Sequence, residues 1–149
     1  MPQFQSFNFR DRFIRHRNFE GLLSRPQDGG PAADFSFTLI SRGAGRVALR
    51  SDNVAGHFLR HANFRIFLAK PANPADRPFM LDSTFFLERG LADPTGVSFR
   101  SVNFPDRFLR HRNFALFLEP RDSPNLAADA TFFRSQIIDD GTELNPVDD

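Results

Sequence analysis

One pattern of hydrophobic and polar residues recurs three times along the chain, at residues 5–23, 50–68 and 100–118. The copies align without a gap and share the skeleton S-x-N, then F-[IL]-R-H-x-N-F, then a leucine. Successive copies of the histidine are 45 and 50 residues apart. A repeat of this length is too short to bury a core of its own, so we expect the copies to pack on one another.

A second block follows each copy and reads ADFSFTL around Asp34, LDSTFFLE around Asp82 and ADATFFRS around Asp129. The aspartate comes 18, 21 and 18 residues after the histidine of its copy. We therefore divide a single domain, residues 1–149, into a first, a second and a third unit and an acidic tail, which we expect to fray. The three units and the tail span about residues 4–46, 47–96, 97–138 and 139–149.

The third unit carries the pattern of a β-hairpin. Segments 107–111 and 114–118 read as its two strands, with Arg112 and Asn113 as a two-residue turn, because asparagine tolerates a positive φ. By the period of two, Phe114 and every second residue after it are expected to share one face.

Two more strands complete that unit. An apolar-rich run at residues 97–101 follows a turn signal, DPTG, and Phe132 and Phe133 mark a fourth strand. The sequence contains no long segment with a period of 3.6 and no recognisable capped helix, so we expect no helices. Four strands in each of three units give about twelve strands in all.

These features predict an all-β fold, a β-trefoil of three four-stranded repeats with pseudo-threefold symmetry. Closing the strands into a barrel with a hairpin cap removes unpaired strand edges. A three-bladed propeller is disfavoured, because propellers have four or more blades.

Composition limits the possible functions. The chain is 40% hydrophobic and 25% charged, which is typical of a globular protein, and we expect a monomer. Its net charge is only +1, so we expect no nucleic-acid partner. Nearly every cation is arginine, with Lys70 the single lysine, and we expect many arginines to pair with aspartates.

The chain has no cysteine, which excludes disulfides, thiolate metal sites and cysteine nucleophiles. It contains neither an N-terminal apolar leader nor a run of about 20 apolar residues, so we expect no membrane partner. Localisation stays open: a cytoplasmic protein as the sequence is written, or a secreted one if a leader precedes it.

The two blocks, F-[IL]-R-H-x-N-F followed by D-x-[ST]-F, resemble the arabinofuranosidase B (AbfB) domain family, carbohydrate-binding module family 42. The resemblance covers about residues 4–138 and is strongest in the third unit. It implies a β-trefoil that binds arabinofuranose side chains of arabinoxylan or arabinan, with one sugar in the pocket of each repeat. It also implies a lectin-like protein without cofactors or metal, whose ligands are arabinose-containing polysaccharides or smaller glycans. The chain departs from the family by carrying phenylalanine where tyrosine is usual, at Phe9, Phe13, Phe104 and Phe108.

The resemblance pairs a histidine with an aspartate in each candidate pocket. A carboxylate accepts hydrogen bonds from two vicinal sugar hydroxyls, and a neutral imidazole donates or accepts one more. The alternative is that each pair only holds a hairpin to the next strand, and a less favoured one is that the three histidines meet at one metal ion. The candidate ligand-binding pairs are His16 with Asp34, His61 with Asp82, and His111 with Asp129.

The residues next to the histidines are predicted to have structural roles. The preceding arginines point to the opposite face of their strand and are expected to pair with carboxylates or carbonyls. Both sets of asparagines read as turn or loop residues. The arginines are Arg15, Arg60 and Arg110, and the asparagines are Asn18, Asn63, Asn113, Asn8, Asn53 and Asn103.

An enzyme is a less favoured alternative. The four glutamates form no recognisable glycosidase pair, and Ser101, His111 and Asp129 form a triad only on paper, without a nucleophile elbow. A His–Asp pair can still act as a general base, so a small standalone enzyme stays open, as does a protein-interaction trefoil with degenerate pockets. We predict no catalytic residues, and a carbohydrate-binding module is the favoured function.

Overall fold

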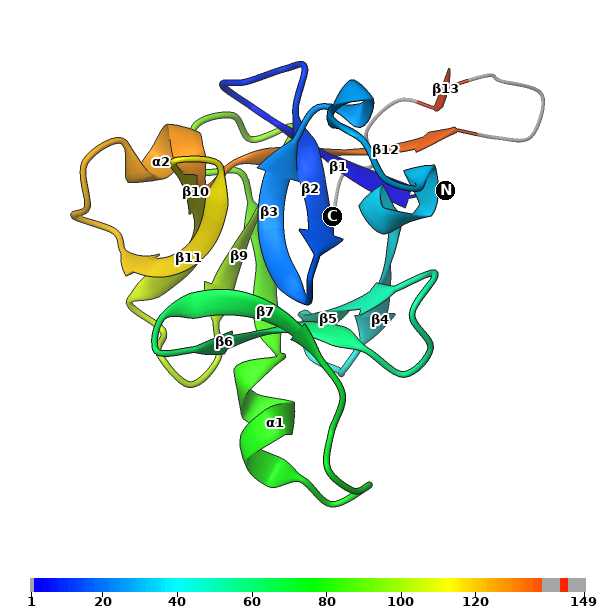
Figure 1. Cartoon of the computed structure of the whole chain (residues 1–149). Helices are drawn as coiled ribbons and strands as arrows, with labels where there is room; N and C mark the ends of the chain where they lie inside the picture. The colour runs from blue at the N-terminus through cyan, green and yellow to red at the C-terminus, as the bar shows by residue number, and fades with distance from the viewer. Residues whose placement is uncertain (1, 138–142, 145–149) are drawn as a thin grey trace.

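The computed structural model of the chain describes residues 2–137 and 143–144, and this part is an all-β fold with few helices (Figure 1). The described strands join through hydrogen-bonded ladders into one continuous, strongly curved sheet. The strands of the first half of the chain are β1 Pro2–Ser6, β2 Phe13–Arg17, β3 Glu20–Ser24, β4 Phe37–Ser41, β5 Arg46–Ser51, β6 Phe58–Ala62 and β7 Arg65–Ala69. Those of the second half are β8 Phe85–Arg89, β9 Val97–Ser101, β10 Arg107–Arg112, β11 Ala115–Pro120, β12 Phe132–Ile137 and β13 Glu143–Leu144.

Each unit contributes a tight hairpin, β2–β3, β6–β7 and β10–β11. Its turn consists of an asparagine and the phenylalanine after it, both with a positive φ, such as Asn113 at 52° and Phe114 at 61°. Positive φ at both central residues gives the turn whose twist matches the strands. The asparagine was therefore predicted correctly, but the predicted turn starts one residue too early. Phe114 lies in the turn, 38% exposed, instead of sharing the face of Leu116 and Leu118.

The three hairpins are hydrogen-bonded to one another in a closed ring. The carbonyl of Phe19, at the tip of the first hairpin, accepts from the backbone N–H of Leu68 in the second, at 2.8 Å. Two equivalent bonds of the same length complete the ring, from Leu118 N–H to the Phe64 carbonyl and from Leu23 N–H to the Phe114 carbonyl. Each hairpin tip is thus tied to the strand that follows the tip in the next hairpin.

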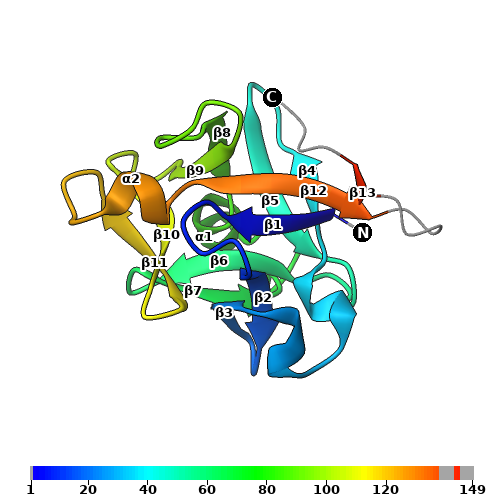
Figure 2. The same ribbon diagram turned by 90° about the horizontal axis from the view of Figure 1, so that it is seen from above.

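The remaining strands form antiparallel pairs β4–β5, β8–β9 and β1–β12. The last pair joins the first described strand to one near the end of the chain, with Pro2 opposite Gln136 and Ser6 opposite Phe132. Figure 2 shows β1 and β12 side by side across the molecule. As predicted, β9 spans Val97–Ser101 and a strand contains Phe132 and Phe133.

The core lies inside the curved sheet and is built from the alternate inward residues of the strands. Phe4, Phe85 and Phe132 surround Phe99, and the Phe4–Phe99 rings meet edge to face at 5.6 Å between centroids. Burying such a side chain contributes about 1.5–3 kcal/mol relative to exposure. Phenylalanine suits these positions because it has no polar atom that needs a partner.

The expectation of no helices is wrong. Helices α1 (Arg77–Asp82) and α2 (Leu126–Asp129) precede β8 and β12, and 3₁₀ turns span Pro26–Asp28 and Ala32–Phe35. The carboxylate of Asp76 caps α1 by accepting from the N–H of Phe79. Both helices are too short to show a period of 3.6, but Asp76 before a proline at the second helical position is a start signal that was available.

Within the described residues, no helix has the length and apolarity needed to cross a membrane. Of the acidic tail, Glu143 and Leu144 are described and pair with β12, so the expectation of fraying is wrong there. The other residues of the segment 139–149 lie outside the described residues.

Candidate functional site

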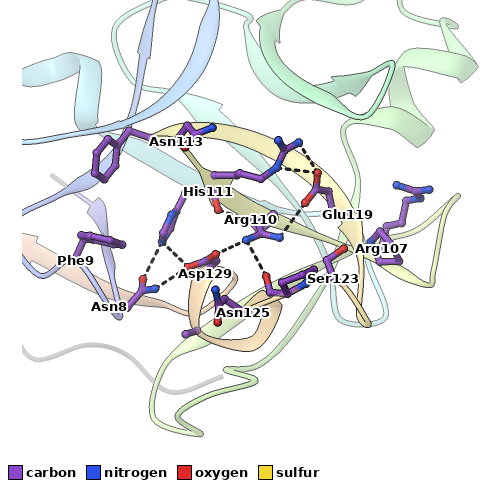
Figure 3. A pocket seen from close by; sticks show the side chains of 15 residues that line it. Asn8, Phe9, Arg107, Arg110, His111, Asn113, Glu119, Ser123, Asn125 and Asp129 are labelled. Carbon is purple, nitrogen blue, oxygen red and sulfur yellow. Dashed lines mark hydrogen bonds and ion pairs between the residues drawn. The ribbon is translucent and has the colours of Figure 1, made fainter.

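The His111 cluster consists of Arg110, His111, Asp129 and Asn8 (Figure 3). His111 and Arg110 lie on β10, Asp129 is the last residue of α2, and Asn8 follows β1 at the other end of the chain. The Nδ2 of Asn8 donates to Asp129 Oδ1 at 2.6 Å, and the Oδ1 of Asn8 accepts from His111 Nε2 at 2.8 Å. The third and first units therefore build this cluster together.

The hydrogen bonds fix the tautomer of His111. The amide of Asn8 is oriented by its donation to Asp129, so its oxygen faces His111 and Nε2 must carry the proton. Ser6 Oγ donates to the same amide oxygen at 3.0 Å. Burial lowers the pKa of His111, and Arg110 lowers it further, against an upward pull from Asp129. His111 is therefore neutral at pH 7, with its Nδ1 as the remaining acceptor.

Asp129 keeps acceptor capacity for a ligand. A carboxylate has about four lone-pair sites. In the described structure the Oδ1 of Asp129 accepts from Asn8 and its Oδ2 accepts from Arg110 Nη2. The remaining sites can accept from two neighbouring hydroxyl groups. Arg110 is held in turn by Glu119, whose Oε1 lies 2.9 Å from Arg110 Nη1, and by the Pro124 carbonyl.

A cleft of about 820 Å³, the His111 cleft, opens over this cluster. Phe9 and Phe114 form an apolar wall, 40% and 38% exposed, with ring centroids 5.4 Å apart in an edge-to-face contact. Phe9 also meets the imidazole of His111 edge to face at 5.4 Å. The opposite wall comes from the segment between β11 and α2, including Ser123 and Asn125. Polar acceptors at the base and exposed rings at the side suit a small polyhydroxylated ligand.

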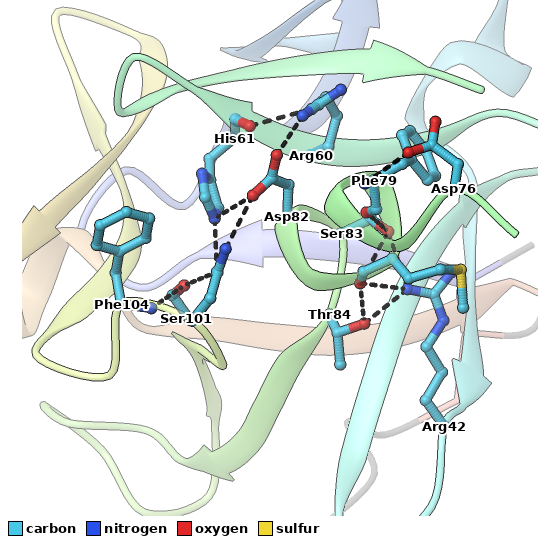
Figure 4. A network of polar contacts seen from close by, with 12 residues as sticks. Arg42, Arg60, His61, Asp76, Phe79, Asp82, Ser83, Thr84, Ser101 and Phe104 are labelled. Atoms are coloured by element: carbon cyan, nitrogen blue, oxygen red, sulfur yellow. Dashed lines mark hydrogen bonds and ion pairs between the residues drawn. The ribbon is translucent and has the colours of Figure 1, made fainter. Parts of the chain in front are cut away.

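The His61 cluster repeats this arrangement with Arg60, His61, Asp82 and Asn103 (Figure 4). His61 Nε2 lies 2.9 Å from Asn103 Oδ1, and Asn103 Nδ2 donates to Asp82 at 2.9 Å. Arg60 Nη2 donates to the other oxygen of Asp82. Its cleft, the His61 cleft, is smaller, at about 280 Å³, and is lined by Phe64 and Phe104.

The His16 cluster consists of Arg15, His16, Asp34 and Asn53. Arg15 is fully buried and donates to Asp34 at 2.9 Å and to the Gly29 carbonyl at 2.7 Å. Gly30 has a φ of +86°, and a side chain there would begin 2.6 Å from the guanidinium of Arg15. Because Gly29 and Gly30 have no side chains, the backbone can lie directly against the guanidinium of Arg15.

The structure brings together each histidine and aspartate that the sequence paired. Their Nε2–Oδ1 distances are 3.6, 3.5 and 3.4 Å from the first unit to the third. The expectation that the preceding arginines pair with carboxylates is confirmed. Although these arginines were expected on the opposite face of the strand, they belong to the same clusters as the histidines. Each one reaches the aspartate that the histidine approaches, as Arg15 does with Asp34.

Sequence reasoning missed the asparagines that join each cluster from the next unit. Asn8, Asn53 and Asn103 were interpreted as turn or loop anchors, yet each bridges a histidine and an aspartate. Their place in the invariant S-x-N motif was the available signal, because a loop anchor alone does not require one residue type in every copy.

The triad considered from the sequence does not form. Ser101 bonds to Asn103 in the His61 cluster, whereas the serine beside His111 is Ser6, at 3.5 Å. The three histidines lie in separate clusters, each on a different asparagine. In the described part of the chain, no group of three or more histidine, aspartate or glutamate side chains is arranged to hold a metal ion.

Comparison with known proteins identifies the family. The model of the alpha-L-arabinofuranosidase B (ABFB) domain matches residues 3–134. The chain therefore belongs to the AbfB domain family, a carbohydrate-binding module of arabinofuranosidases. A search of curated proteins gave no match.

Solved structures show the same fold. A GH54 α-L-arabinofuranosidase soaked with a cyclic sulfate inhibitor has a TM-score of 0.76 at 22% sequence identity, over 89% of this chain and 30% of its own. An arabinofuranosidase complexed with arabinofuranosyl-α-1,2-xylobiose gives the same TM-score, identity and coverage. A Polyporus squamosus lectin bound to a human-type influenza-binding epitope has a TM-score of 0.68 at 9% identity, over 91% of this chain and 49% of the lectin. The chain thus spans about 30% of the length of the arabinofuranosidases that it matches.

Proposed function

We propose that this protein is a β-trefoil of three repeats that binds arabinofuranose side chains of arabinoxylan or arabinan through its histidine–aspartate clusters. The single observation that carries the proposal is the His111 cleft, where a pre-arranged polar cluster lies beside exposed aromatic rings. Family membership supports the ligand class, since an arabinofuranosidase with this fold has been solved with an arabinofuranosyl-xylobiose.

The cluster suits sugar hydroxyls better than proton transfer. Asp129 is held by Arg110 and Asn8, and the protonated nitrogen of His111 is engaged by the same asparagine. Such a network holds acceptors in place without moving a proton, and a small sugar gains from this pre-organisation. The exposed faces of Phe9 and Phe114 supply the apolar contact that the C–H faces of a sugar ring require.

We assign the binding roles to His111 with Asp129, His61 with Asp82, and His16 with Asp34. A single sugar site of this size is expected to bind with a Kd of about 0.1–1 mM, equivalent to −4 to −5.5 kcal/mol. Several such sites on one domain raise the apparent affinity for a polymer that carries many side chains.

Titration of the full chain with arabinoxylan- and arabinan-derived oligosaccharides, followed by NMR, tests the proposal. We expect saturable shifts at the His111 cleft that His111→Ala and Asp129→Ala each abolish. The matched controls are His57→Ala and Asp106→Ala, which remove the same residue types outside the three clusters and are expected to bind normally. Absence of saturation at about 10 mM oligosaccharide, with every variant folded, contradicts the proposal.

A further inference from the structure

A separate hollow of about 380 Å³, which we call the arginine cleft, lies between the β4–β5 turn and α1. Arg42 and Arg46 reach it from the two ends of that turn, and Arg77 from the first residue of the helix. Its lining also includes Met80, Leu81 and Val102. None of these residues belongs to the histidine clusters.

The charges in the arginine cleft are not neutralised by the part of the chain that the structure describes. The arginines of the histidine clusters each form an ion pair with an aspartate. By contrast, Arg42, Arg46 and Arg77 form no ion pair with any described carboxylate, and the described lining of the cleft contains no acidic residue. All three arginines that line the hollow are positively charged, so each of them attracts an anion bound there.

Arg42 is fixed in place, but only one of its three guanidinium nitrogens donates to described residues. Its Nη1 alone donates to Ser83 Oγ at 2.8 Å and to Thr84 Oγ1 at 2.7 Å, as Figure 4 shows. The described residues accept nothing from its Nε or Nη2. Burial lowers the pKa of Arg42, because the guanidinium has lost part of its water, yet an arginine stays charged at neutral pH.

The other two arginines are available for the same ligand. Among the residues that the structure describes, Arg46 is held only through its Nε, which donates to the Gly43 carbonyl at 2.9 Å, and Arg77 lies exposed on the helix. A planar guanidinium binds a carboxylate through two parallel hydrogen bonds. Met80, which is 40% exposed, and Val102 offer apolar contact beside the charges.

We propose that the arginine cleft binds the carboxylate of an acidic sugar, a uronic acid unit, on the glycan that the histidine clusters recognise. The positive cleft is read directly from the structure, whereas the assignment to a glycan rests on the proposed function. The arginine cleft then selects chains that carry both neutral furanose branches and acidic units. The uronate is held by charge, so its binding weakens as salt is added.

NMR titration with glucuronate, and separately with sodium phosphate and neutral glucose, tests this proposal on the full chain. We expect glucuronate to shift the amide signals of Thr84 and Val102 in a saturable way and glucose to leave them unchanged. The double variant R46Q/R77Q is expected to weaken glucuronate binding at least tenfold. Arg50→Gln, an exposed arginine of β5 outside the cleft, is the matched control and is expected to change nothing.

The outcomes separate this proposal from the preceding one. Arabinose-bearing neutral oligosaccharides must still bind R46Q/R77Q at the His111 cleft if only the arginine cleft has been changed. Phosphate binding as tightly as glucuronate would overturn the sugar assignment and leave a general oxyanion site. Unshifted Thr84 and Val102 signals with glucuronate, or full binding in R46Q/R77Q, would overturn the proposal entirely, whatever happens at the His111 cleft.

Discussion

The His111 and His61 clefts lie over clusters of the same four polar residue types but differ almost threefold in volume, about 820 against 280 Å³. The difference comes from their outer walls. In the third unit Glu119 bridges Arg110 of the base and the exposed Arg112, at 2.9 and 2.6 Å, and so holds Arg112 at the rim. The aligned positions of the second unit, Ala69 and Ala62, provide no such bridge.

The two clefts also differ in how deeply the arginine is held. The Arg110 side chain is 4% exposed between two carboxylates, whereas Arg60 is 25% exposed and, among the described residues, forms an ion pair only with Asp82. A repeated polar base therefore does not make equivalent sites. Every unit has the same polar base, and we expect the rim to set how much of a glycan each proposed site can hold.

The largest expected effect concerns stability. Arg110→Met leaves the buried Asp129 without its ion-pair partner, although Glu119 keeps Arg112, so we expect the free energy of unfolding to fall by about 3–5 kcal/mol. Arg60→Met, in the more exposed cluster, is expected to cost only about 1 kcal/mol. Urea unfolding of the two variants measures both values. Equal losses would show that the two arginines are held alike.

The next effect concerns binding. Asp129→Asn removes a charged acceptor from the His111 cleft, and we expect affinity for an arabinose-bearing oligosaccharide there to fall by about 2 kcal/mol, roughly 30-fold. Asp82→Asn is expected to leave binding in the His111 cleft unchanged. NMR signals from β10 and α2, compared with those from β6 and α1, report the two clefts separately. A loss in both clefts from either variant would show that the sites are not independent.

A smaller effect tests the rim directly. Glu119→Ala frees Arg112 at the rim, while Arg110 stays paired with Asp129, and we expect a branched oligosaccharide to bind the His111 cleft about fivefold more weakly, near 1 kcal/mol. A free arabinose unit, which needs only the base, is expected to bind as before. The reciprocal change, A62R/A69E, is expected to strengthen binding of the branched ligand in the His61 cleft. Calorimetry with both ligands distinguishes a rim effect from damage to the base.

The smallest expected effect is a pH dependence of stability. The pKa of His111 is lowered in the folded protein, so the unfolded chain takes up the proton first as the pH falls. The free energy of unfolding is therefore expected to decrease as the pH falls below about 6.5, the ordinary histidine value, and not to depend on this group above that pH. His111→Gln should flatten that part of the profile in urea unfolding at several pH values. An unchanged slope would contradict the role of burial.

Much of the base of each site was predictable from the sequence, because the repeat places histidine and aspartate at matching offsets in every unit. The missing member, such as Asn8 in the His111 cluster, lies 103 residues from its histidine. Only closure of the whole chain brings such residues together, and spacing within one copy does not report it. The predicted turn lies one residue too early. The alternation of hydrophobic and polar residues favoured Phe114 on a strand face, whereas the observed turn places Phe114 at a positive φ.

The pairing of β1 with β12 has a consequence for biosynthesis. Strand β1 and Asn8 are synthesised well before their partners, β12 and His111. The His111 cleft is therefore the last of the three sites to be assembled, and a prematurely terminated chain lacks it while still carrying the residues of the other two. The widest cleft can thus form only after Asp129 and β12 have been synthesised, which makes it a marker that this whole domain has been made.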